Sequence, residues 1–110
     1  RVGYSKAMEM ALTGEPITGE EAMAAGMLTA LTEPEDVLET AVALAERIAE
    51  NAPLAVAASK ALVRAAASGI DEDKLWEMQV PLQKKVFSSN DAKEGPVAFA
   101  EKRAPNWTGT

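Results

Sequence analysis

The stretch that most constrains the fold is LAVAASKALVRAAA, residues 54–67, because it contains seven alanines and neither glycine nor proline. Alanine has the highest helix propensity of all residues. Apolar residues fall on nearly every side of the helix that this stretch predicts, and such a helix should be sandwiched between other elements. Hydrophobic residues make up 47% of the 110 residues but aromatic residues only 5%, so typical strand formers are scarce. The sequence therefore predicts a mainly α fold.

Start and stop signals place further helices on both sides of this one. Thr18 followed by Glu21 is a capping box, and Pro34 fits a first helical turn. Pro81 falls inside a helical pattern, where a proline costs about 3 kcal/mol, so we expect a kink or a break there. The predicted helices cover residues 4–12, 19–25, 34–50, 53–67, 71–87 and 90–103.

Only MLTAL, residues 27–31, has the pattern of a strand, and it is short. The first thirty residues, with short helices and this strand, therefore differ in kind from the residues that follow. We predict that the residues that follow form a helical bundle.

Composition and charge exclude several kinds of chemistry. The chain has no cysteine and no histidine, which removes disulfides, thiolate and imidazole catalysis and almost every zinc site. No carboxylates have calcium-loop spacing, and no apolar run is long enough to span a bilayer. The net charge of −6 argues against general nucleic-acid binding. We expect no metal, no nucleic acid and no membrane partner, and a cytoplasmic location.

The clustered carboxylates have a structural explanation. Glu20 and Glu21 are adjacent, so their side chains diverge on a helix, and Glu21 is the capping partner of Thr18. Asp71 opens a predicted helix, and Asp91 with Glu94 repeats a cap pattern at another. We predict no catalytic residue in this chain.

The basic C-terminal end is unusual in an acidic chain. Residues 84–110 carry five basic and three acidic groups, whereas residues 1–50 carry three basic and ten acidic groups. If the last helix reaches Arg103, then Phe99, Lys102 and Arg103 lie on neighbouring parts of one surface. A cation beside an aromatic ring can hold a phosphate while the ring meets an adenine or an acyl chain. The alternative is that both cations only satisfy the helix C-terminus and the ring only packs.

Three blocks of sequence resemble one protein family. GYSKAMEMALTGEPITGEEAMAAGML, LAERIAENAPLAVAASKALV and FSSNDAKEGPVAFAEKRAPNW occur in the order found in the C-terminal part of the enoyl-CoA hydratase/isomerase (crotonase) family. The resemblance implies that residues 1–31 are the end of a spiral core of ββα repeats. It implies that residues 32–110 form a C-terminal helical region that joins subunits into trimers or dimers of trimers.

The resemblance also implies an activity. Members bind acyl-CoA thioesters and stabilise an enolate oxyanion with two backbone N–H groups, and hydratases add two glutamates that handle water and the proton. Those segments would precede Arg1, so no catalytic residue is carried over. The aromatic residue and lysine of AFxEKR, here Phe99 and Lys102, are implied to contact the CoA part of the substrate, with no permanently bound cofactor.

Two functions of different classes follow. The first is the C-terminal segment of an acyl-CoA enzyme, most simply an enoyl-CoA hydratase, with isomerase, dehydratase and hydrolase activities as variants. The second is a non-catalytic helical self-association module without activity of its own. Because the first residue is Arg1 and helical pattern begins at once, we expect a fragment in either case.

Overall fold

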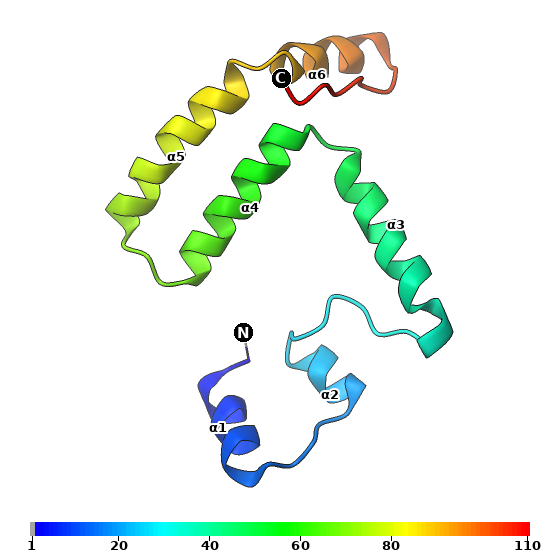
Figure 1. The fold of residues 1–110 in the computed structure, drawn as a ribbon, viewed down its shortest axis with the longest axis vertical. Helices are drawn as coiled ribbons and strands as arrows, with labels where there is room; N and C mark the ends of the chain where they lie inside the picture. The colour runs from blue at the N-terminus through cyan, green and yellow to red at the C-terminus, as the bar shows by residue number, and fades with distance from the viewer. Residues whose placement is uncertain (1) are drawn as a thin grey trace. The chain divides into compact units, whose positions relative to one another are not determined.

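The computed structural model describes residues 2–110, and every regular element in that range is helical (Figure 1). This confirms the mainly α prediction. The elements are α1 (Tyr4–Thr13), α2 (Gly19–Ala24), a 3-10 turn η1 (Pro34–Asp36), α3 (Val37–Ala49), α4 (Pro53–Ala67), α5 (Glu72–Phe87) and α6 (Asp91–Glu101).

The chain divides into two compact units, residues 1–44 and 45–110, with the boundary inside α3. The first unit contains α1, α2 and the start of α3. In it, the predicted capping box is formed, because Thr18 Oγ1 accepts from Glu21 N at 3.2 Å and Thr18 N donates to Glu21 Oε2 at 2.8 Å. Gly14 ends α1 in the left-handed conformation with φ 68°, which glycine adopts without steric cost.

The prediction of a strand over residues 27–31 is wrong for this structure. The segment is irregular, and no strand occurs between Val2 and Thr110. A strand needs a neighbouring strand to pair its N–H and C=O groups, and the described residues provide none. The short apolar run therefore becomes a loop between α2 and η1.

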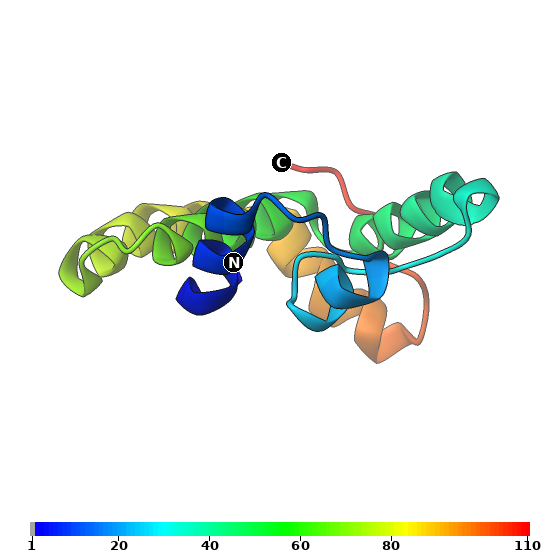
Figure 2. The same cartoon turned by 90° about the horizontal axis from the view of Figure 1, so that it is seen from below.

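In the second unit, α4 and α5 form a helical hairpin, and α5 packs in turn against α6. Figures 1 and 2 show α4 and α5 side by side and antiparallel. Gly69, with φ 77°, allows the reversal between them. The helix α5 continues through Pro81 without a break, so a break at this proline is not observed. Proline lacks one N–H donor and its ring crowds the carbonyl group four residues earlier, yet the helix continues on both sides of it.

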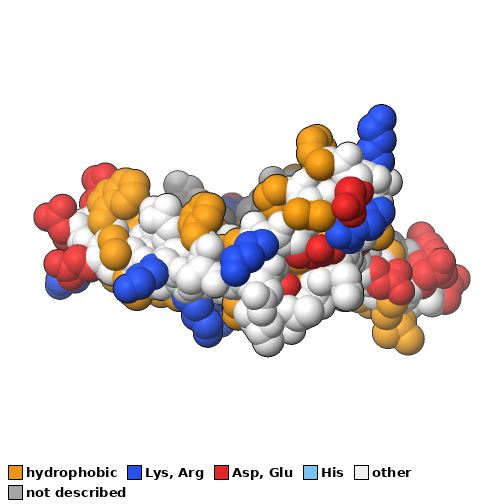
Figure 3. Space-filling model, turned by 90° about the horizontal axis from the view of Figure 1, so that it is seen from above, with side chains coloured by type: hydrophobic (Ala, Val, Ile, Leu, Met, Phe, Trp, Pro, Cys, Tyr) orange, Lys and Arg blue, Asp and Glu red, His pale blue; other side chains and the backbone are white. Residues whose placement is uncertain are grey.

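The expected sandwiching of α4 is also not found within its own unit, residues 45–110. Ala98 is the only buried hydrophobic residue between Val2 and Thr110. Val63 on α4 is 68% exposed and Phe87 on α5 is 71% exposed. Figure 3 shows such apolar side chains standing at the surface beside charged ones. Apolar surface of this extent is typical of a contact face.

No helix within residues 2–110 is both long enough and apolar enough to cross a bilayer.

Candidate functional site

The candidate site is the end of α6 together with the residues that follow it. The Ser89 side chain satisfies a backbone N–H group in the first turn of this helix. Its Oγ accepts from Ala92 N at 3.1 Å and donates to Val86 O at 2.6 Å. The predicted cap by Asp91 and Glu94 is therefore wrong, because neither side chain caps α6. Both carboxylates instead bind the segment after the helix, as described below.

The helix ends at Glu101, two residues before the predicted end. Lys102 then adopts the left-handed conformation, with φ 56° and ψ 38°. It is the only non-glycine residue with positive φ among residues 2–110. Lys102 N donates to Phe99 O at 3.2 Å and Arg103 N donates to Ala98 O at 3.1 Å. This is the Schellman arrangement, in which glycine is the usual residue at the left-handed position.

Phe99 and Lys102 lie one helical turn apart and are both exposed. The Phe99 ring is 87% exposed, and Lys102 forms no ion pair within the described part of the chain. An exposed ring and a cation without a partner are available to a ligand. The arrangement suits an anion next to a flat apolar group.

Arg103, in contrast, is engaged by carboxylates of its own chain. Its guanidinium makes a two-pronged ion pair with Glu94, including Nη2 to Oε2 at 3.1 Å, and its Nε donates to Glu101 Oε2 at 2.6 Å. The Arg103 hydrogen bonds, together with one from Asn106 N, lower the pKa of Glu94 to about 2. Glu94 and Glu101 in turn raise the pKa of Arg103. Arg103 therefore has a structural role within the described residues, in contrast to Lys102.

Asp91 holds the C-terminal tail, residues 104–110, back against α6 (Figure 1). The Asp91 side chain is 3% exposed and accepts from Thr108 N at 2.7 Å, Gly109 N at 3.0 Å and Thr108 Oγ1 at 3.1 Å. The bond from Thr108 N is the main cause of a lowered pKa of Asp91. Sequence reasoning missed this role, because the partners lie seventeen and eighteen residues away.

Trp107 connects the tail to the helices of the same unit. Its Nε1 donates to Glu50 O at 2.8 Å, after the end of α3. The Trp107 ring packs against α6 at Gly95, where a β-carbon would lie 3.4 Å from the ring, at van der Waals contact. Beside Trp107 is an open cavity of about 550 Å³, lined mainly by apolar residues of α3 and α4.

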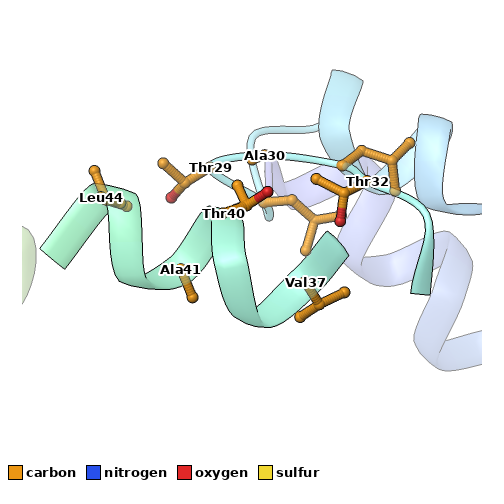
Figure 4. A pocket seen from close by; sticks show the side chains of 9 residues that line it. Thr29, Ala30, Thr32, Val37, Thr40, Ala41 and Leu44 are labelled. Atoms are coloured by element: carbon orange, nitrogen blue, oxygen red, sulfur yellow. The ribbon is translucent and has the colours of Figure 1, made fainter. Parts of the chain in front are cut away.

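A second open cavity, of about 380 Å³, lies within the first unit (Figure 4). It is formed by residues 28–32 and the start of α3, where Thr29 and Thr32 extend beside Thr40. No titratable side chain lines it, so it offers no acid–base chemistry.

The other carboxylates singled out in the sequence have structural partners. Asp71 Oδ1 accepts from Asp73 N at 3.0 Å at the start of α5. Hydrogen bonds from its own backbone and from Thr18 lower the pKa of Glu20. Within residues 2–110 there is no group of three or more potential metal ligands.

The chain matches one protein family over its whole length. The profile described as enoyl-CoA hydratase/isomerase covers residues 1–110. An enoyl-CoA hydratase from Mycobacterium tuberculosis is 39% identical over 107 residues, which are 97% of this chain and 40% of that protein. A carnitinyl-CoA dehydratase from Proteus mirabilis is 39% identical over 104 residues, covering 92% of this chain and 40% of that protein. The chain thus spans about 40% of the length of these curated relatives.

Solved structures agree with this match. An enoyl-CoA hydratase from Mycobacterium marinum has a TM-score of 0.93 at 49% identity, covering 100% of this chain and 45% of that one. An enoyl-CoA hydratase from Mycobacterium tuberculosis has a TM-score of 0.92 at 46% identity, covering 100% of this chain and 43% of that one. The matched region is the C-terminal portion of their crotonase fold.

Proposed function

The chain belongs to the enoyl-CoA hydratase/isomerase family, and we propose that it is the C-terminal part of an enzyme that hydrates a 2,3-enoyl-CoA thioester. The observation that carries this proposal is the match of all 110 residues to the family. The names of the relatives, enoyl-CoA hydratase and carnitinyl-CoA dehydratase, support addition or removal of water at an acyl-CoA. The oxyanion-binding N–H groups and catalytic carboxylates would come from the part of the enzyme outside these residues.

Within that enzyme, residues 1–31 are assigned to the end of the spiral core and residues 32–110 to the C-terminal helical region. The irregular segment 27–31 supports this assignment, since an apolar run of this kind pairs as a strand only when a sheet is beside it.

Phe99 and Lys102 are assigned to the CoA part of the substrate. CoA carries a 3′-phosphate and a diphosphate, and a lysine ammonium binds such oxygens as a compact point charge. The exposed Phe99 ring offers a face on which an adenine can stack. The support is that this ring and this cation, which has no ion pair within residues 2–110, lie one turn apart at the end of α6.

The test is Lys102→Ala in the full-length enzyme. A charge-assisted hydrogen bond contributes about 1.5–3 kcal/mol, so KM for an enoyl-CoA should rise roughly ten-fold or more. The value of kcat should change little, because the ammonium binds the ground state and the transition state alike. Hydration is followed by the loss of ultraviolet absorbance of the conjugated thioester. An unchanged KM would remove Lys102 from the CoA site.

Self-association is the second proposed function, and the exposed apolar residues favour it. Val63, Val80 and Phe87 are each more than half exposed on α4 and α5, and such faces are covered in stable assemblies. We assign this surface to a homo-oligomer, a trimer or a dimer of trimers. Light scattering of residues 1–110 and of the full-length enzyme tests it, and a monomer at tens of micromolar for both would contradict it.

A further inference from the structure

The left-handed conformation of Lys102 requires an explanation beyond helix termination. A side chain at this position is disfavoured because its β-carbon approaches a carbonyl oxygen, and glycine would end α6 without that conflict. Non-glycine residues keep such a conformation where the surrounding structure holds it, and these positions concentrate at functional sites. The residues that hold Lys102 can be identified from the contacts around it.

The backbone is fixed on both sides of Lys102. On the helix side, its N–H donates to Phe99 O. On the other side, Arg103 is joined to Glu94, nine positions earlier on α6. The same carboxylate accepts from Asn106 N at 2.7 Å, so it fixes the chain again three residues further along. Glu94 therefore ties the segment directly after Lys102 to the helix before it at two points, Arg103 and Asn106.

The ion pairs of Arg103 with Glu94 and Glu101 also determine which cation is available to a ligand. Arg103 takes up the carboxylates of both Glu94 and Glu101. Neither of these acids forms an ion pair with Lys102 in the described residues. The charge of Lys102 thus stays open to a ligand, while the neighbouring charge of Arg103 is neutralised within the chain.

We propose that Glu94 and Arg103 are positioning residues that hold Lys102 in the left-handed conformation and so direct its ammonium group to the phosphates of the CoA substrate. This inference rests on the CoA site proposed above. Neither residue is assigned a contact with substrate, and both act through the backbone and charge of Lys102.

The test uses the full-length enzyme and two substrates with the same enoyl group, one on CoA and one on pantetheine, which lacks the phosphates. Glu94→Gln keeps the shape of the side chain but removes its charge. We expect KM for the CoA substrate to rise about five-fold or more, because small displacements of a binding group reduce its contribution strongly. KM for the pantetheine substrate and both kcat values should stay within about two-fold.

Two further variants keep the result interpretable. Arg103→Lys retains the positive charge but loses the two-pronged geometry, so it should give the same selective rise in KM even if Glu94→Gln folds poorly. Glu9→Gln breaks the exposed Lys6–Glu9 ion pair on α1 and is the matched control, expected to change neither KM.

The outcomes separate the two proposals. If Lys102→Ala raises KM for the CoA substrate alone while Glu94→Gln and Arg103→Lys raise neither KM, the positioning role is overturned and the CoA site stands. An equal rise for both substrates in these two variants also overturns positioning, because it indicates a general structural defect. If Lys102→Ala does not distinguish the substrates, the CoA site is overturned and the positioning role with it.

Discussion

Replacing Lys102 by glycine should stabilise the protein while weakening its binding of CoA. Lys102 has φ 56° and ψ 38°, close to the centre of the left-handed region at about 57° and 47°. A β-carbon there costs about 1–2 kcal/mol in the folded state. Glycine removes this cost but makes the unfolded chain more flexible, which costs about 0.4–1 kcal/mol. With the middle value of each range, the difference is a gain of about 0.8 kcal/mol, since both hydrogen bonds of the motif come from the backbone and are retained.

The assay is urea unfolding of the full-length enzyme, at one protein concentration because assembly makes stability depend on it. In thermal unfolding of the same enzyme, a gain of this size corresponds to a rise in Tm of about 2–3 °C for a protein of roughly 250 residues. Affinity for CoA is measured on the same samples by calorimetry and should fall, because the ammonium group is lost. A higher free energy of unfolding together with a lower affinity for CoA is what we expect when a binding residue has a strained backbone.

Lys60→Gly is the matched control for this experiment. Lys60 is also an exposed lysine, but it lies in the middle of α4. Glycine in a helix interior costs about 1 kcal/mol, so this variant should be less stable. If Lys102→Gly lowers the free energy of unfolding as much as Lys60→Gly does, the reasoning about the left-handed position is refuted.

Three other predictions concern the hydrogen bonds of the chain. Thr18→Ala should lower the free energy of unfolding by about 1 kcal/mol in a urea titration, because it removes the cap of α2, whereas Thr18→Ser should not. Trp107→Phe should lower the free energy of unfolding by about 1 kcal/mol, because the hydrogen bond to Glu50 O is lost, and an unchanged urea midpoint would contradict this. The pKa of Glu94 falls from 4.5 to about 2 on folding, so the unfolded chain binds more protons in this range. Stability should therefore decline as the pH falls from about 4.5 towards 2. Glu94→Gln should flatten this decline in an acid titration followed by circular dichroism, and an unaltered slope would count against the ion pair.

Helices and their ends could be predicted from the sequence because they depend on neighbouring residues. The Thr18–Glu21 box and the prolines at Pro34 and Pro53 all occupy the predicted places. Each acts within one turn of the helix, through a hydrogen bond or through φ. The predicted strand over residues 27–31 was wrong for the opposite reason, since a strand depends on a partner that local sequence does not describe.

The candidate site was only partly visible in the sequence. The spacing of Phe99 and Lys102 indicated one surface, and both side chains are exposed at the end of α6. The predicted helix end at Arg103 hid the left-handed conformation of Lys102, because lysine is not the usual residue at such a position. The carboxylates of Asp91 and Glu94 resemble caps in sequence, yet they bind the tail.

The sequence by itself thus determined the helices, their caps and the resemblance to an acyl-CoA enzyme family, because these depend on residues close together in the chain. Only the tertiary structure decided that the tail returns along α6, so that Asp91 meets Thr108, Glu94 meets Arg103 and Trp107 meets Glu50. These contacts join residues nine to fifty-seven positions apart. Their formation depends on the free energy of packing and of satisfying buried polar groups, which no local pattern specifies.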